Sequence, residues 1–290
     1  MRVGVQFPNE FFDDDPLAIR DFAQAAEGLG YAHVLIYEHV LGVEHADRNP
    51  PVVIPYDEGT LFHEPMVLCG YLAAVTTSIE LATGIVVLPQ RQTALVAKQA
   101  AEISFLSNER LRLGVGVGWN PLEFEGLGAN YRDRGARSEE QIDLLRQLWT
   151  DPVVDFDGKW HRIDRAGINP RPRSAIPLWV GGFSEAAFDR AARIGDGFIY
   201  SLYGPDGPDG ETKGTIDHLR DLVEGYGRKP DDFGIDLLAP LDLKPDEFAR
   251  LVEAWEGTGV THMTLHLLWG DPTASAKIAA LTQYMRALEG

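Results

Sequence analysis

The stretch from Ile79 to Asn120 constrains the fold of this chain more than any other. It begins with IELATGIVVLP, an apolar run rich in valine and isoleucine, as expected of a strand that is buried on both faces. A segment of good helix formers, ALVAKQAAEISFL, follows, and RLRLGVGVGWN then has the pattern of a second strand. A strand, a helix and a strand within about 40 residues predict a βαβ unit.

The same alternation continues along the whole chain. Eight strand–helix units follow one another at fairly regular spacing in 290 residues, and no change of composition separates two domains. We therefore predict an α/β protein whose residues 1–290 form a single TIM (β/α) barrel domain. An open, doubly wound sheet is the alternative, because eight strands in one domain favour closure of the sheet without requiring it.

Residues 151–163 interrupt this alternation. The sequence VVDF-DG-KWHRI predicts an inserted β-hairpin with a type I′ turn at Asp157-Gly158. Because the insertion follows a helix, we expect it at the end of the barrel opposite the active site.

Composition excludes several classes of partner. The formal net charge of -18 repels nucleic acid and anionic membranes, so an anionic ligand must be bound by local cations or backbone amides. The single cysteine, Cys69, lies in an apolar helical run and is expected to be an inert core thiol. No signal peptide precedes the first strand and no run is long and apolar enough to span a bilayer, so we expect a cytoplasmic protein.

Barrel enzymes place their active sites at the C-terminal ends of the strands. The residues at these ends here include Glu38, His39, Gly84, Ile85, Gly116, Gly118, Trp119, Asn120, Gly181, Gly182 and Ser184. Gly114, Gly116 and Gly118 lie on one face of a strand, which fits either close packing or the approach of a ligand. The segment from Gly181 to Ser184 precedes a helix, where free backbone amides and the helix dipole favour an anion.

The histidines at the strand ends allow several roles. Glu38-His39 can bind a metal, move a proton or orient a ring, and a purely structural pair is also open. His45 and His63 are nearby in the sequence, but their spacing from His39 is not that of a known metal site. His266, in the last strand, fits either a substrate contact or a hydrogen-bonded core histidine.

Four segments together resemble a known family. They are YAHVLIYEHVLG, FHEPMVLCGYLAAVTTSIELATGIVVLPQRQTALVAKQAAEISFLS, RLRLGVGVGWNPLEFEGLG and PLWVGGFSEAAFDRAARIGDGF, and they cover most of residues 1–200. With them the chain resembles the luciferase-like monooxygenase superfamily, and within it the actinobacterial oxidoreductases that use the deazaflavin coenzyme F420. The last third of the chain matches only in pattern.

The resemblance implies a barrel fold and a set of site residues. A non-proline cis peptide at Gly84-Ile85 is implied behind the cofactor ring, and Glu38 and His39 are implied to line the ring site as catalytic residues. The resemblance places the other cofactor contacts at Gly116, Gly118, Trp119, Asn120, Gly181, Gly182 and Ser184, the last three around the phosphate. Related sugar-phosphate dehydrogenases have a catalytic glutamate about where Trp119 stands, which argues against that substrate.

These points together predict an oxidoreductase that transfers a hydride between coenzyme F420 and a small organic substrate. His39 is expected to transfer a proton or to form a hydrogen bond to substrate or ring, and Glu38 to orient His39 or to contact the ring edge. The two long loops expected at 40–62 and 120–135 would close over the site. The acidic tail of F420 would need cations at the mouth, for which Arg91, Lys98, Arg132, Arg134 and Arg137 are available.

Three other functions fit the same sequence features. An FMN-dependent monooxygenase with a partner reductase is the main alternative, and the others are a flavin- or deazaflavin-binding protein without turnover and a metal-dependent barrel hydrolase. No metal is expected in the favoured reading. Relatives are often dimers through barrel helices, so a homodimer is possible.

Overall fold

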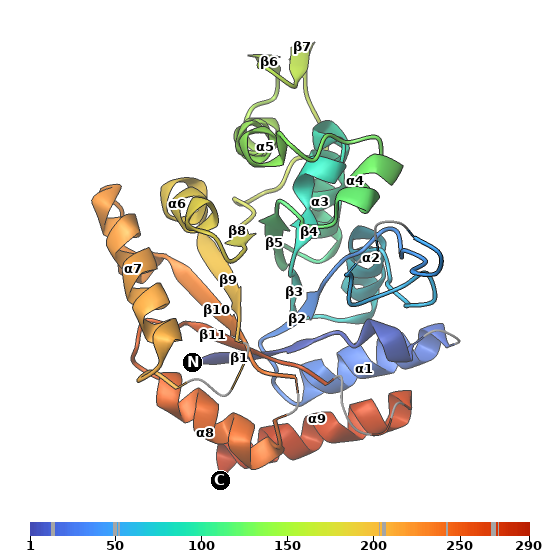
Figure 1. Cartoon of the computed structure of the whole chain (residues 1–290), viewed down its shortest axis with the longest axis vertical. Coiled ribbons are helices and arrows are strands. Elements are labelled where there is room, and N and C mark those ends of the chain that lie inside the picture. The colour runs from blue at the N-terminus through green and yellow to red at the C-terminus, as the bar shows by residue number, and fades with distance from the viewer. Residues whose placement is uncertain are drawn as a thin grey trace.

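A parallel barrel surrounded by helices forms the body of the molecule (Figure 1). The computed structural model describes residues 1–12, 15–48, 51, 53–202, 204, 207–241, 243–267, 271 and 273–290. The barrel strands are β1 (Arg2–Gln6), β2 (His33–Ile36), β3 (Glu80–Thr83), β4 (Val86–Val87), β5 (Leu111–Gly116), β8 (Leu178–Gly181), β9 (Gly197–Ser201), β10 (Gly234–Leu238) and β11 (His262–Leu265).

The strand pairings close this sheet. The order is β3-β2-β1-β11-β10-β9-β8-β5-β4, and β3 also pairs with β5. Because β3 and β4 are two parts of one barrel position, both beside β5, the sheet has eight positions. The predicted TIM barrel is therefore confirmed, and the open doubly wound sheet is excluded.

Helices follow the strands and pack around the barrel. They are α1 (Pro16–Gly28), α2 (Pro65–Val75), α3 (Thr93–Leu106), α4 (Pro121–Gly126), α5 (Arg134–Thr150), α6 (Glu185–Ile194), α7 (Glu211–Gly225), α8 (Pro245–Trp255) and α9 (Ala274–Glu289). Proline occupies the first position of α1, α2, α4 and α8, where no backbone N–H is needed. No described helix is long and apolar enough to cross a membrane.

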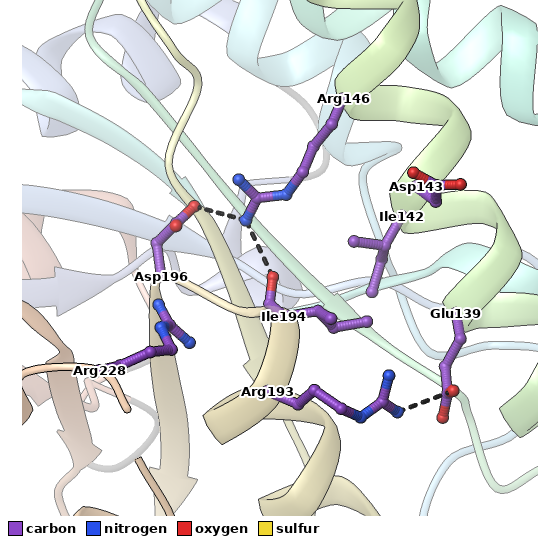
Figure 2. Close-up of a pocket in the computed structure, with 8 residues that line it drawn as sticks. All are labelled: Glu139, Ile142, Asp143, Arg146, Arg193, Ile194, Asp196 and Arg228. Atoms are coloured by element: carbon purple, nitrogen blue, oxygen red, sulfur yellow. Dashed lines mark hydrogen bonds and ion pairs between the residues drawn. The ribbon is translucent and has the colours of Figure 1, made fainter. Parts of the chain in front are cut away.

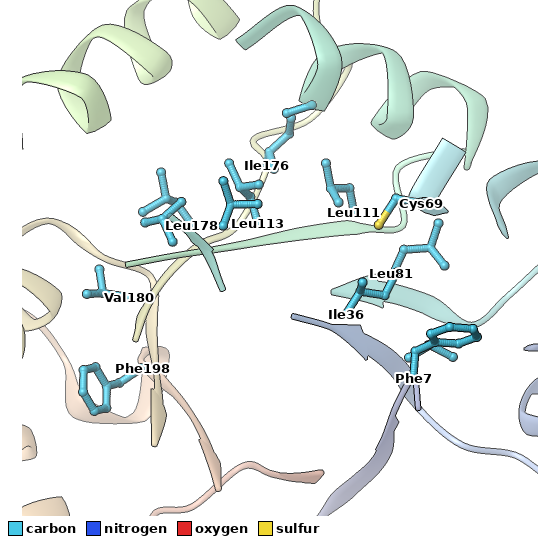
Figure 3. Close-up of a cluster of buried hydrophobic side chains, with 14 of the residues drawn as sticks. Phe7, Ile36, Cys69, Leu81, Leu111, Leu113, Ile176, Leu178, Val180 and Phe198 are labelled. Atoms are coloured by element: carbon cyan, nitrogen blue, oxygen red, sulfur yellow. The ribbon is translucent and has the colours of Figure 1, made fainter. Parts of the chain in front are cut away.

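The main hydrophobic core lies between the strands and the helices. Figure 3 shows fully buried side chains from the strands, among them Leu81 of β3, Leu113 of β5 and Phe198 of β9, in this layer. Cys69 of α2 joins them with no exposed surface, and burial raises the pKa of its thiol to about 12. The prediction of an inert core thiol is confirmed.

A polar network fills the barrel interior near the N-terminal ends of the strands. The Arg112 guanidinium donates to the Asp236 carboxylate at 3.0 Å and to Glu80 at 2.6 Å. His33 Nε2 lies 2.7 Å from Thr264 Oγ1 and 3.3 Å from Asp236. His33, Glu80 and His262 form the one group among the described residues with a spacing that could suit a metal, but the Arg112 cation already binds Glu80. We interpret this network as structural.

The inserted hairpin exists, but two details of its prediction are wrong. It consists of β6 (Val154–Asp157) and β7 (Arg162–Ala166), and Asp157 pairs with Arg162 across a four-residue loop. A type I′ turn needs positive φ at Asp157 and Gly158, and neither has it. The Glu140 carboxylate accepts the backbone N–H groups of the next three residues, which fixes the longer loop.

The position of the hairpin also differs from the prediction. Its strands lie outside the ring of helices, beyond α5 (Figure 1). In the loop at its tip, His161 Nε2 lies 2.7 Å from Thr93 Oγ1 at the start of α3, and Trp160 Nε1 donates to Asp133 just before α5. Both helices start at the C-terminal end of the barrel strands. The tip therefore reaches the active-site end, because the hairpin runs back along α5 instead of staying where the preceding helix ends.

Candidate active site

A cavity of about 440 Å³ opens at the C-terminal ends of the barrel strands. Residues that follow β2, β5 and β8, the link between β3 and β4, and side chains of β9 and β10 line it. Ten of the eleven predicted site residues meet there, namely Glu38, His39, Gly84, Ile85, Gly116, Gly118, Trp119, Gly181, Gly182 and Ser184. Segments up to about 150 residues apart in the sequence thus form one site, as the barrel rule predicts.

Ile85 projects from the break between β3 and β4 into this cavity. The peptide bond Gly84-Ile85 is cis, as the family resemblance implies. A Cβ atom at Gly116 would lie 2.6 Å from Ile85 Cδ1, and one at Gly181 would lie 2.6 Å from Ile85 Cγ2. Only glycine at these two positions leaves room for the Ile85 side chain, so the glycines and Ile85 together shape one wall.

The glycine row of β5 therefore has two explanations. A Cβ atom at Gly114 would lie 1.9 Å from the Thr83 carbonyl oxygen, so close packing of strands requires this glycine. Gly116 and Gly118 line the cavity, and Gly118 has a φ of +67°, which disfavours any side chain.

No hydrogen bond joins the side chains of Glu38 and His39 within the described part of the chain, so the prediction that Glu38 orients the imidazole is wrong, while a contact of Glu38 with the ring edge stays a prediction. The buried carboxylate of Glu38 accepts hydrogen bonds from Arg91 Nη2 at 2.6 Å and from the Val87 N–H at 3.1 Å. Arg91 also binds Glu64 at 2.6 Å. Burial raises the pKa of Glu38, and the Arg91 cation opposes that shift. A buried carboxylate needs such a cation, and Arg91 rather than the neighbouring histidine supplies it.

His39 instead has partners that sequence patterns did not reveal. Its Nδ1 lies 2.7 Å from Tyr56 Oη and 3.3 Å from Glu123 Oε2. Glu123, in the first turn of α4, is buried and also accepts the Val40 and Leu41 N–H groups. Burial alone would raise the pKa of Glu123, but these hydrogen bonds outweigh it and lower the pKa, so the carboxylate is ionised.

Asn120 lies behind the cavity wall, which corrects its predicted place beside the cofactor. Its Oδ1 accepts from the Leu122 N–H at 3.0 Å and caps α4, while its Nδ2 donates to Tyr56 Oη at 2.9 Å. The Asn-Pro pair at 120–121 is a helix start signal that could have placed Glu123 on the first turn of a helix. The region 120–135, expected to be a loop, therefore contains α4.

Aromatic side chains surround His39. Its ring centroid lies 4.0 Å from that of Tyr56, 5.1 Å from that of Phe62 and 5.8 Å from that of Trp119. Tyr56 and Phe62 belong to the segment 40–62, so this segment packs directly onto the predicted site. Trp119 lines the cavity and leaves 46% of its surface exposed. We call His39, Tyr56, Phe62 and Trp119 the aromatic wall; His39 and Trp119 line the cavity, and Tyr56 and Phe62 pack against His39.

The other side of the cavity offers groups that suit an anion. Gly181 and Gly182 precede α6, and the Ser184 side chain accepts the Ala187 N–H at 3.3 Å and caps this helix. Arg134 is the sole lysine or arginine among the described residues that line the cavity. Its guanidinium donates to the Gly118 carbonyl oxygen at 3.2 Å and lies over the ring of Tyr131.

The remaining predicted cations and histidines lie elsewhere. Lys98 binds Glu102 and the Asn169 carbonyl oxygen, and Arg91 is held by Glu38 and Glu64, so neither lines the cavity. His45 and His63 bind the carbonyl oxygens of Tyr56 and Phe12, and the described residues show no metal-like group of His39, His45 and His63. His266 is also absent from the lining of the described cavity.

A second pocket lies between α5 and α6, where charged residues bind one another. Figure 2 shows Arg146 reaching Asp196 and the Ile194 carbonyl oxygen, and Arg193 reaching Glu139. Asp196 immediately precedes β9, so this pocket is near the N-terminal end of that strand. Both its place in the barrel and its paired charges disfavour it as an active site.

Comparisons with known proteins agree with this geometry. The family model for luciferase-like monooxygenases matches residues 1–287, and the chain belongs to this family. An uncharacterised protein of Mycobacterium tuberculosis is 35% identical over 243 residues, 82% of this chain and 81% of the relative. An F420-dependent glucose-6-phosphate dehydrogenase of Nakamurella multipartita is 31% identical over 236 residues, 80% of this chain and 65% of the relative.

Solved structures share the fold at lower identity. Monooxygenase RslO1 from Streptomyces bottropensis superposes with a TM-score of 0.79 at 20% identity, covering 100% of this chain and 99% of that one. An F420-dependent secondary alcohol dehydrogenase in complex with an F420-acetone adduct also gives 0.79, at 17% identity over 99% and 98% of the two chains. In both superpositions the shared barrel fold covers nearly the whole of this chain.

Proposed function

We propose that this protein is an oxidoreductase that binds coenzyme F420 in the cavity at the barrel mouth and transfers a hydride to or from a small organic substrate. The observation that carries this proposal is the convergence of three features in one cavity: the glycine-lined wall at Ile85, the anion-binding segment before α6, and His39. Relatives with F420 in their names, at 31% and 26% identity, support the choice of cofactor.

The residues present fit such a cofactor. The Ile85 wall and the backbone of Gly116 and Gly118 provide a surface without protruding side chains, against which a flat ring can lie. Gly181, Gly182 and Ser184 would hold the phosphate at the start of α6, with Arg134 as the nearby cation. These groups would bind the anionic phosphate locally, on a protein whose formal net charge is -18.

Bound F420 would supply a ring carbon that accepts or donates a hydride and that reacts poorly with oxygen. The chain's own residues bind and orient the substrate and move the proton. His39 is the proposed catalytic residue: its Nε2 accepts the hydroxyl proton of an alcohol substrate, or returns it to a carbonyl oxygen in the reverse direction. Tyr56 and Phe62 cover His39 and exclude water from it.

The aromatic wall indicates an uncharged substrate. Beside it, the cavity carries the carboxylates of Glu38 and Glu123, and Arg91 is held in two ion pairs behind Glu38. Arg134, the one lysine or arginine of the described lining, is assigned above to the cofactor phosphate, which leaves no second cation in that lining for a substrate phosphate. Trp119 adds apolar surface, so we propose a small neutral alcohol or carbonyl compound rather than a sugar phosphate.

One observation favours FMN as the alternative cofactor. Of the five cations expected to meet the acidic tail of F420, Arg91 and Lys98 are paired elsewhere, and Arg134 alone lines the described cavity. One arginine and a helix start suffice for a single phosphate. The second candidate function is therefore an FMN-dependent monooxygenase that receives reducing equivalents from a partner reductase.

Turnover tests the proposal directly. The purified protein would be mixed with oxidised F420 and a panel of neutral alcohols, or with reduced F420 and the matching aldehydes and ketones, while the deazaflavin absorbance is followed. We expect hydride transfer with at least one neutral pair and none with glucose 6-phosphate. Substrate-dependent oxygen consumption with FMN and a reductase, and no reaction with F420, would move the protein to the alternative function.

A further inference from the structure

We infer that Glu123 is a positioning residue that holds His39 in the tautomer protonated at Nδ1, so that the lone pair is on Nε2, the ring nitrogen that has no hydrogen-bond partner among the described residues. The inference takes the catalytic role of His39 from the proposed function, but the tautomer itself is a property of the protein alone. Two side chains, Glu123 and Tyr56, lie within hydrogen-bond distance of Nδ1.

The first neighbour of Nδ1 is a carboxylate that can only accept. Glu123 Oε2 lies 3.3 Å from Nδ1 and also accepts from Gln90 Nε2 at 3.2 Å. Glu123 Oε1 accepts the N–H groups of Val40 and Leu41, the two residues that follow His39. An unprotonated Nδ1 would place its lone pair opposite those of the ionised Glu123 carboxylate, and the two would repel each other. A proton on Nδ1 removes this repulsion.

The second neighbour is the Tyr56 hydroxyl, 2.7 Å from Nδ1, which can donate or accept. Asn120 Nδ2 donates to the same oxygen at 2.9 Å, so this oxygen already serves as an acceptor. Burial raises the pKa of Tyr56 to about 12, and the hydroxyl keeps its proton at neutral pH. A protonated Nδ1 can donate to Glu123 Oε2 and to Tyr56 Oη, whereas an unprotonated Nδ1 would accept the Tyr56 hydroxyl proton and leave its neighbour Glu123 Oε2 without a donor from His39.

The opposite ring nitrogen is then available for chemistry. Nε2 of His39 makes no hydrogen bond within the described part of the chain, and His39 lines the cavity. Glu123 also holds the backbone at Val40 and Leu41, so it fixes the place of the ring as well as its proton. Neither Glu38 nor Arg91 can do this, because they bind each other.

Nitrogen NMR of the protein without cofactor tests the tautomer. Two-dimensional spectra of ¹⁵N-histidine-labelled protein at pH 8 distinguish protonated Nδ1 from protonated Nε2, and the His39→Ala variant identifies the His39 signals. We expect protonated Nδ1 in the natural protein. In Glu123→Gln the new amide N–H faces Nδ1, so we expect the proton to move to Nε2. A natural protein protonated at Nε2, or no change in Glu123→Gln, would overturn the inference.

Two further variants complete the test. Glu140→Gln is the matched control, because Glu140 also accepts three backbone N–H groups and binds a histidine, His161, at 2.8 Å outside the cavity. It should leave the His39 signals unchanged. Tyr56→Phe should keep Nδ1 protonated, and a proton moved to Nε2 there would assign the role to Tyr56 instead.

Turnover separates this inference from the proposed function. With an accepted substrate, Glu123→Gln should lower kcat about 10- to 100-fold with a smaller change in KM, whereas Glu140→Gln should retain kcat. If the NMR result holds but neither F420 nor FMN supports turnover, the proposed function fails and the positioning of His39 by Glu123 stands.

Discussion

At the scale of single residues, His39 is the one side chain on which the proposed chemistry depends. Replacing it with alanine removes the proton acceptor but leaves the glycine-lined wall and the segment before α6 intact. We expect kcat to fall by about 100-fold or more, with a much smaller change in the cofactor dissociation constant. Steady-state kinetics and a binding titration check both quantities.

The matched control for His39 is His218, an exposed histidine that binds Glu185 at 2.8 Å on the surface. His218→Ala should retain full activity. Unchanged turnover in His39→Ala would remove His39 from the reaction and leave it a structural part of the aromatic wall.

Arg91 gives a prediction about stability at the same scale. Arg91→Met leaves the carboxylate of Glu38 buried without its cation, and breaking a buried pair in this way costs about 3–5 kcal/mol. Denaturant unfolding should show this loss. Arg20→Met, which breaks an exposed pair with Asp21, should leave the free energy of unfolding nearly unchanged. Equal effects of the two variants would contradict the structural role of Arg91.

At the scale of elements, the contact between the β8 end and the β3–β4 link controls the cofactor wall. Gly181→Ala places a Cβ atom 2.6 Å from Ile85 Cγ2, so the Ile85 side chain must move into the cavity. We expect the affinity for the cofactor to fall about 10-fold or more, measured by titration. Gly70→Ala in α2 meets no atom within 4 Å and should leave the affinity unchanged. Full affinity in Gly181→Ala would show that Ile85 does not form the binding surface.

The junction of α1, α2 and β3 carries a pH-dependent contribution to stability. Burial would raise the pKa of Glu27, but hydrogen bonds from Ser78, Ile79 and Thr77 outweigh it and lower the pKa to about 2. The pKa is lower in the folded than in the unfolded state, so the stabilisation is complete above about pH 5 and disappears as the pH falls toward 2.

The variant Glu27→Gln tests this contribution. We expect it to lose about 1 kcal/mol at pH 7, a modest value because the carboxylate is partly exposed. The difference from the natural protein should shrink between pH 5 and pH 2 in denaturant unfolding. A difference that stays constant over this range would mean that the Glu27 charge is not involved.

The elements also show what the sequence could predict. Hydrophobic periodicity and the positions of glycine and proline located most of the helices and strands, because these signals are local in the sequence. The error at residues 120–135 had a local cause, since the Asn120-Pro121 helix start was not recognised. The hairpin could not be placed from its own sequence, because the Glu140 carboxylate of α5 determines its loop.

The site was predictable to the same extent. The strand-end rule brought ten predicted residues to one cavity without any knowledge of their contacts. The partners of those residues were not predictable: Glu38 pairs with Arg91, and His39 with Tyr56 and Glu123. Such pairs join segments far apart in the sequence, and no local pattern encodes them.

At the scale of the whole molecule stands the claim that this barrel binds a deazaflavin. Fluorescence titrations of the purified protein with F420 and, under identical conditions, with FMN measure the two affinities. We predict saturable binding of F420 with a dissociation constant at least about 10-fold below that for FMN. Tighter binding of FMN, or no binding of either cofactor, would contradict the claim.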